Sequence, residues 1–177
     1  MRTNDYIYPD SELYDYVMAE FIAKGVTKEK IGQIVYDLEH AYLPDLTLED
    51  YTREVSSVLH KREVLNNIAT GLYLDKMANK GLLDKPLQSI IENDAGVYGV
   101  DEVLATAVAN IYGSIGLTNY GFNDKTKAGV IGELDNNHGE VNTFIDDAVG
   151  AVAAAVAGKL AHATVDSDLD DMGAVID

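Results

Sequence analysis

Two adjacent pairs of acidic residues lie in apolar sequence, where charged side chains are unexpected. Asp101 and Glu102 open the segment Val-Asp-Glu-Val-Leu-Ala-Thr-Ala-Val, and Asp146 and Asp147 precede Ala-Val-Gly-Ala-Val. An ionised carboxylate that is buried without a partner costs several kcal/mol, so such groups pair with a cation. Because carboxylate oxygens are the ligands that Mg²⁺ prefers, the two pairs could bind a divalent cation together.

A third acidic residue, Asp124, has Lys125 and Lys127 close to it in the segment Phe-Asn-Asp-Lys-Thr-Lys-Ala-Gly. A lysine near metal-binding carboxylates could neutralise the charge of a bound phosphate. The competing interpretation of Asp101 and Asp146 is helix capping, because an acidic residue stabilises a helix N-terminus by about 1 kcal/mol. Capping does not by itself explain why the acids come in pairs.

The first half of the sequence predicts helices. Apolar residues recur at helical spacing in four segments, residues 10–25, 27–43, 47–59 and 64–81. Asp10 and Ser11 are candidates to cap the first helix and Thr27 the second, and Thr47 with Asp50 predicts a capping box at the third.

The second half predicts helices separated by glycine-rich breaks. The predicted helices are a short one near residues 87–91, an apolar one over 101–115 and a last one over 141–162. Between the last two lie a break at 116–121 and a further segment over 123–132. The segment Glu-Asn-Asp-Ala-Gly places Asp94 at a helix end and turn, and His138 lies in a second turn, where a surface side chain is expected. From Thr164 onward the acidic sequence predicts a mobile, solvated end.

These elements predict an all-α protein, a multi-helix bundle in which an N-terminal helical hairpin region packs on a C-terminal helical core that contains the carboxylates. We divide the chain into an N-terminal helical region, a helical core and an acidic C-terminal tail, over residues 1–82, 83–163 and 164–177. The Ala- and Gly-rich segment from Ala148 to Ala157 predicts close helix packing within or between subunits. We therefore expect a homo-oligomer.

The charge and composition narrow the range of partners. The chain has 13 Lys and Arg residues against 30 Asp and Glu residues, a net charge of −17, which would repel phosphate backbones and predicts no nucleic-acid binding. No cysteine is present, which excludes disulfides and thiol nucleophiles. No apolar segment approaches the roughly 20 residues that span a membrane, and the N-terminus lacks a secretory signal. We expect a cytoplasmic protein with no transmembrane segment.

Residues 94–160 resemble the phosphatidylglycerophosphatase A family, and particularly its soluble Gram-positive relatives. The resemblance rests on Val-Asp-Glu at 100–102, Asp-Lys-Thr-Lys at 124–127, and Asp-Asn-Asn-His-Gly followed by Phe-Ile-Asp-Asp over 135–147. It implies site positions at Asp101, Glu102, Asp124, Lys127, Asp146 and Asp147, with His138 and Gly139 as weaker additions. The Pro-Gly-Thr-x-Gly-Ser-type motif of the membrane-embedded members is not evident.

The resemblance and the carboxylates together predict a phosphomonoester hydrolase that depends on Mg²⁺ or Mn²⁺. Asp101, Glu102, Asp146 and Asp147 would hold the metal, Lys127 would neutralise the phosphoryl group, and Asp124 would orient or deprotonate the attacking water. The substrate would be a phosphorylated small molecule or a lipid headgroup, reached through transient contact with a membrane surface. Two alternatives remain open, a non-catalytic helical regulatory or oligomeric module and an all-α nucleotide pyrophosphohydrolase.

Overall fold

The chain folds into helices, and no β-strand occurs among residues 6–173, the part that the computed structural model describes, with side chains placed as far as residue 163. The helices are α1 (Asp10–Ala23), α2 (Lys28–Glu39), α3 (Leu48–Leu59), α4 (Arg62–Asn79), α5 (Lys85–Glu92), α6 (Val100–Ala109), the 3₁₀ turn η1 (Asn110–Tyr112), α7 (Gly113–Thr126), α8 (Val130–Asp135) and α9 (Ile145–Gly173). The predicted all-α class is confirmed.

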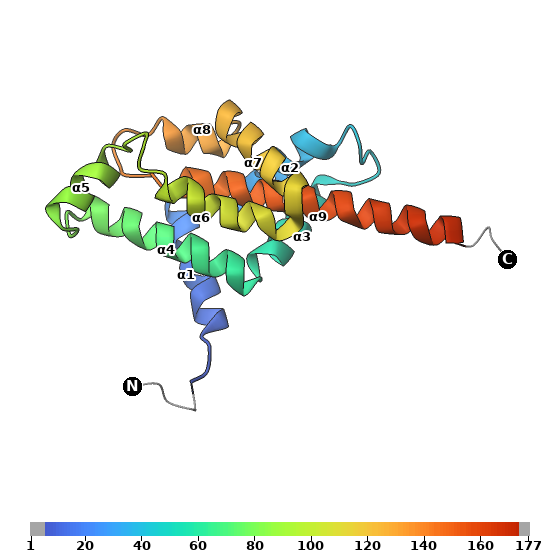
Figure 1. Cartoon of the computed structure of the whole chain (residues 1–177), viewed down its shortest axis with the longest axis horizontal. Helices are drawn as coiled ribbons and strands as arrows, with labels where there is room; N and C mark the ends of the chain where they lie inside the picture. The colour runs from blue at the N-terminus through green and yellow to red at the C-terminus, as the bar shows by residue number, and fades with distance from the viewer. Residues whose placement is uncertain (1–5, 174–177) are drawn as a thin grey trace.

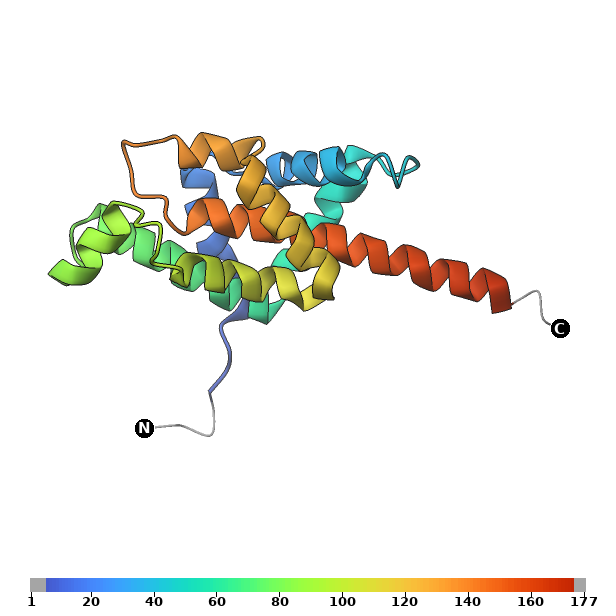
Figure 2. The same ribbon diagram turned by 45° about the horizontal axis from the view of Figure 1, so that its top comes forward.

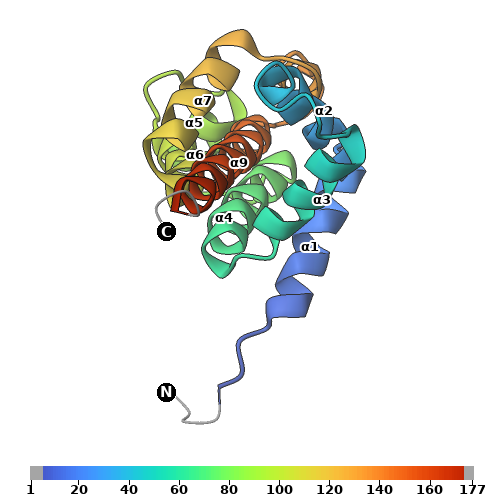
Figure 3. The same cartoon turned by 90° about the vertical axis from the view of Figure 1, so that its right-hand side faces the viewer.

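Helix α9 is the central element of the bundle. Figure 3 looks nearly along it and shows α6 and α7 on one side, α2 and α3 on the other, and α4 beside it. The part of α9 that is surrounded in this way is fully buried from Ala151 to Ala157. Because helices of the N-terminal region pack directly on α9, the predicted arrangement of a hairpin region on a helical core is confirmed.

Small residues allow α7 to approach α9 closely. A methyl group added to Gly158 would lie 3.1 Å from the backbone nitrogen of Gly116 and 3.1 Å from Cβ of Tyr112. A methyl group added to Gly116 itself would lie only 2.1 Å from the carbonyl oxygen of Ala109, so the same glycine also packs against the end of α6. The close packing predicted for the Ala- and Gly-rich segment is thus present within one chain.

Two capping predictions for the N-terminal helices are confirmed and one is wrong. The Thr27 hydroxyl accepts a hydrogen bond from the backbone of Lys30, and Thr47 forms the predicted capping box with Asp50. Helix α1 has no side-chain cap. The carboxylate of Asp10, a predicted cap, instead accepts two hydrogen bonds of 2.7 Å from Arg62, which tie α1 to α4.

The predicted helix boundaries in the second half are wrong in three places. Helix α6 ends at Ala109 and the chain turns at Gly113, whose φ of 73° suits glycine, so the helix predicted over 101–115 is present only as far as Ala109. The break predicted at 116–121 lies inside α7, because Gly116 serves close packing rather than a turn. Helix α9 starts at Ile145 instead of residue 141.

The segment that was predicted to be a mobile tail is in part helical. Residues 164–173 continue α9, and Figures 1 and 2 show this part extending past the other helices. Residues 174–177, the rest of the predicted tail, lie outside the described residues.

Candidate functional site

The predicted metal ligands are placed by the first turns of two helices. Asp101 and Glu102 lie in the first turn of α6, and Asp146 and Asp147 lie in the first turn of α9. The fold brings the N-terminal ends of these two helices to the same cavity, although the two acidic pairs are far apart in sequence. Asp101, Asp146 and Asp147 are buried, whereas Glu102 is exposed.

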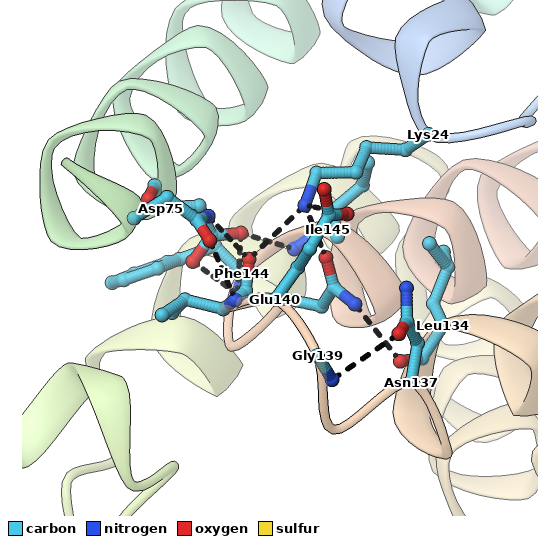
Figure 4. Close-up of polar contacts among 11 residues, drawn as sticks. Lys24, Asp75, Leu134, Asn137, Gly139, Glu140, Phe144 and Ile145 are labelled. Carbon is cyan, nitrogen blue, oxygen red and sulfur yellow. Dashed lines mark hydrogen bonds and ion pairs between the residues drawn. The ribbon is translucent and has the colours of Figure 1, made fainter.

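The loop before α9 is held by a carboxylate from the N-terminal region. Asp75, buried in the C-terminal part of α4, accepts hydrogen bonds from the backbone N–H groups of Phe144 and Ile145 at 3.1 Å, as Figure 4 shows. Lys24, which directly follows α1, donates to Glu140 and to Asn142 of the same loop, at 2.8 Å in each case. The N-terminal helices thereby fix where α9 begins.

Lys127 is the charged centre of the site. It follows α7 in a left-handed conformation, with φ of 46°. Its ammonium lies 2.9 Å from Asp146 and 3.0 Å from Asp124, with Asp135 at 3.7 Å and Asp147 at 3.8 Å. Burial opposes the charge, but the neighbouring carboxylates, Asp146 first, outweigh it and raise the pKa of Lys127, so the lysine is protonated.

All six predicted residues line one cavity, which we call the acidic cavity. Its volume is about 100 Å³, and its walls are Asp94, Ala95, Gly96, Gly99, Asp101, Glu102, Asp124, Lys127, Thr143, Asp146 and Asp147. Three sequence segments that are well separated in the chain therefore converge on a space that is polar and small. The space therefore gathers carboxylate oxygens and one ammonium group.

The carboxylates of the cavity are crowded. Burial, with the adjacent Asp146 carboxylate adding to it, raises the pKa of Asp147 to about 7. Burial also raises the pKa of Asp146, although the Lys127 ammonium acts in the opposite direction. One oxygen of Asp101, a residue only 9% exposed, has no hydrogen-bond partner in the described part of the chain. These groups would be stabilised by added positive charge.

The side chains of the site are of the types that bind a metal ion, but they are not arranged as a ligand set. Oxygen donors, an unpartnered buried carboxylate oxygen and a raised carboxylate pKa suit a hard divalent cation. Within residues 6–163, however, no three acidic or histidine side chains are arranged as ligands of one ion. Lys127, rather than a metal, compensates Asp146 in this arrangement.

Two residues of the site were missed by the sequence analysis. Asp94 lies in the predicted turn, with φ of 45°, yet it also lines the acidic cavity, because the following glycine-rich loop leads back to α6. Asp75 was missed although a signal existed. It lies at helical spacing from the apolar residues Leu72 and Ala78, which marks an acid on a buried stripe.

A larger cavity adjoins the acidic cavity. It has a volume of about 480 Å³ and shares Asp94, Thr143 and Asp146 with its smaller neighbour. His138, one of the weaker site residues, is exposed and lines this larger cavity. Gly139 lines neither cavity in the described part of the chain, and its N–H closes the turn on the side chain of Asn137 (Figure 4).

None of the helices in the described part of the chain combines the length and the apolar character that a membrane crossing needs.

Similar proteins have been found in Gram-positive bacteria. The uncharacterized Bacillus subtilis protein YutG is 47% identical over 153 residues, covering 86% of this chain and 92% of the relative. The crystal structure of the low temperature requirement C protein from Listeria monocytogenes matches with a TM-score of 0.83 and 47% identity, over 88% of this chain and 98% of that chain. That of ypjQ from Bacillus subtilis matches with a TM-score of 0.84 and 43% identity, over 90% of this chain and 99% of that chain.

The family comparison covers most of both halves of the fold. The model of the phosphatidylglycerophosphatase A family matches residues 17–162, which include every residue that lines the acidic cavity. The match also extends over the N-terminal helices that hold the start of α9. This chain therefore belongs to the phosphatidylglycerophosphatase A family.

Proposed function

We propose that the protein is a Mg²⁺-dependent hydrolase of phosphomonoesters and that the acidic cavity is its active site. The observation that carries the proposal is the convergence of the three motifs, 101–102, 124–127 and 146–147, on one cavity of about 100 Å³. Membership of the phosphatidylglycerophosphatase A family supports the reaction class. The two Bacillus subtilis relatives carry no function in their descriptions and do not narrow the substrate.

The four carboxylates Asp101, Glu102, Asp146 and Asp147 are the proposed metal ligands. A bound Mg²⁺ would supply the positive charge that offsets both these carboxylates and the phosphoryl oxygens. Asp147 is the most informative ligand, because burial and Asp146 together raise its pKa to about 7. Cation binding would favour its ionised form and release a proton near neutral pH.

Lys127 is the proposed group that binds the phosphoryl oxygens. Its ammonium is protonated and faces the acidic cavity, so it can neutralise charge that builds up on the phosphoryl group during transfer. The ion pairs with Asp124 and Asp146, at 3.0 and 2.9 Å, hold its side chain in that position.

Asp124 is the proposed base. Water attacks phosphorus, the bond between phosphorus and the ester oxygen breaks, and the products are an alcohol and inorganic phosphate. Asp124 orients the water and accepts its proton, which is then available to the departing alkoxide. The carboxylate is half-buried at the cavity wall, where a water between it and a phosphoryl group can lie.

The adjoining cavity of about 480 Å³ is the proposed place of the substrate beyond its phosphate. It shares a wall with the acidic cavity and is lined mainly by polar side chains, including Asn93, Asn137 and Asn142. Amide groups of this kind bind hydroxyls and other neutral polar groups. The proposed substrates are therefore phosphorylated small polar molecules or the phosphorylated headgroup of a lipid.

Hydrolysis assays test the proposal. We expect the unaltered chain to release phosphate from soluble phosphomonoesters or from lipid phosphates in mixed micelles only when Mg²⁺ or Mn²⁺ is present. Asp147→Asn should reduce this activity by about 100-fold, the upper end of the loss that follows from removing a group that only supports a metal ligand. Asp45→Asn, at an exposed position outside the cavity, is the matched control. Equal activity of Asp147→Asn and the unaltered chain would overturn the site.

One observation favours a second candidate, a non-catalytic helical module that keeps the family fold. Lys127 already compensates Asp146, and no three side chains of the described part form a ligand set. Titration with Mn²⁺, followed by its electron paramagnetic resonance signal, separates the candidates. Binding that Asp147→Asn abolishes supports the hydrolase, whereas no binding at millimolar Mn²⁺ supports the non-catalytic module.

A further inference from the structure

The outward faces of α6 and α7 carry no charge over a long stretch. Residues 103–123 contain no Asp, Glu, Lys or Arg, although charged residues make up 24% of the chain. The other long uncharged stretch, residues 148–158, is buried in the centre of the bundle, which explains its composition. Residues 103–123 have no such explanation, because many of their side chains are exposed.

Several of the exposed side chains on these helices are large and apolar. Val103 is 64% exposed and Phe122 is 54% exposed. Together with the loop before α6 they form what we call the outer apolar surface, consisting of Val97, Val100, Val103, Ile115, Leu117 and Phe122. Figure 3 shows α6 and α7 on the same side of α9, opposite α1 and α3. Exposed large apolar side chains on two helices that contact each other are candidates for an interaction site.

The outer apolar surface borders the acidic cavity. Val103 follows Glu102 directly, and Phe122 precedes Asp124 by two residues, and both acids line the cavity. A lipid whose phosphorylated headgroup occupies the two cavities would therefore have its apolar chains beside these side chains. The role of this surface in bringing a substrate to the cavity rests on the proposed function. The binding of the surface to a partner does not.

We propose that the outer apolar surface docks the protein on the surface of a lipid layer, with the acidic cavity facing the headgroups. The charge distribution selects this partner. A chain with a net charge of −17 is repelled by anionic lipid, and an uncharged face is what lets it approach a lipid interface. Valine, isoleucine, leucine and phenylalanine side chains bind there by burying apolar area.

Binding to phosphatidylcholine vesicles, measured by co-sedimentation of the full chain, tests the proposal. The double variant Val103→Ser/Phe122→Ser should bind at least about tenfold more weakly, because two exposed apolar side chains no longer enter the interface. The control Ile22→Ser/Tyr42→Ser removes two other exposed apolar side chains, at 62% and 79% exposure, and should bind like the unaltered chain. Adding phosphatidylglycerol should weaken binding at low salt, and higher salt should restore it.

Three results would overturn the docking proposal. The first is no binding of the unaltered chain to vesicles, and the second is an equal loss of vesicle binding in the control variant. The third is a dimer in sedimentation velocity that only Val103→Ser/Phe122→Ser disrupts, which would assign the surface to a second copy of the chain. Hydrolysis of a soluble phosphomonoester separates this proposal from the proposed function. The surface variant should keep that activity, whereas vesicle binding without any hydrolysis would overturn the hydrolase and leave the docking surface standing.

Discussion

The two sides of the acidic cavity differ in how their carboxylates are held. At the start of α9, Asp75 accepts hydrogen bonds from the backbone, and Asp146 is ion-paired with Lys127 at 2.9 Å. At the start of α6 no side chain caps the helix, Glu102 is exposed, and one oxygen of Asp101 has no partner among the described residues. Acidic pairs that look alike in sequence are therefore fixed on one side and uncommitted on the other.

The two sides of the cavity are therefore expected to respond differently to a bound cation. On the α9 side, the Lys127 ammonium at 2.9 Å compensates Asp146, so the position of this carboxylate is set before a ligand arrives. The α6 side retains unused acceptors, and a cation that enters the cavity gains most from them. Variants that remove a contact from one side of the cavity test this difference, beginning with Lys127.

The largest effect is expected from Lys127→Met. The variant loses the cation that faces the phosphoryl group and leaves Asp146 buried without its partner. We expect the rate of phosphomonoester hydrolysis to fall by about 10²–10³-fold, the range seen when one preorganised electrostatic group is removed. Steady-state kinetics at saturating Mg²⁺ measure it. Lys125→Met, at an exposed neighbouring position, is the control and should change the rate less than about threefold.

A large loss of stability is expected when the fixed side loses its anchor. Asp75→Ala leaves the N–H groups of Phe144 and Ile145 without acceptors in a buried loop, which should lower the free energy of unfolding by about 2–4 kcal/mol. Asp101→Asn provides the contrast, because the oxygen that it alters has no partner to lose. Urea unfolding of both variants measures the difference.

An equal loss of stability in Asp75→Ala and Asp101→Asn would contradict this difference and show that the two sides are held alike.

Much of the fold follows from local sequence signals. The capping box of Thr47 and Asp50 is a short-range pattern, and the structure forms it as expected. Glycine was harder to interpret, because the sequence alone does not distinguish a turn from a close contact. Gly113 breaks the chain with a positive φ, whereas Gly116 lies inside α7 and permits its approach to Ala109. That choice depends on packing partners distant in the sequence.

The candidate site shows the same division. Acids in apolar surroundings identified Asp101 and Asp147, because burial of a charge leaves a mark in the local sequence. The role of Asp75 depends on backbone groups that lie 69 and 70 residues further along the chain, and no local pattern indicates such a contact. Likewise, the sequence suggested a lysine for a phosphate, but not that Lys127 would be ion-paired to Asp146.

A change that is smaller per pH unit is expected in the pH dependence of stability. Burial raises the pKa of Asp75 to about 8, although the backbone hydrogen bonds act against it, while in the unfolded chain the pKa is near 3.8. Between these values the folded state holds a proton that the unfolded state has lost, so stability falls as pH rises from about 4 to about 8. One such group contributes a slope of at most about 1.4 kcal/mol per pH unit.

Urea unfolding from pH 5 to pH 9 measures this slope. In Asp75→Asn the contribution of this residue is absent, so the decline of stability with pH should be shallower than in the unaltered chain. An unchanged slope in Asp75→Asn would show that Asp75 does not bind the proton, and would leave Asp147, whose pKa is about 7, as the source.

The smallest effect is expected at the uncommitted side. Gly99 precedes α6 with φ of 68°, and an added methyl group would meet nothing within 4 Å, so Gly99→Ala costs only backbone strain. We expect a loss of about 1 kcal/mol in the free energy of unfolding. If Asp101 and Glu102 adjust to a ligand, the same variant should raise the Mg²⁺ concentration needed for half-maximal activity by a few-fold. Gly81→Ala, which has φ of 65° and open space but lies outside the cavity, should lose similar stability without that shift.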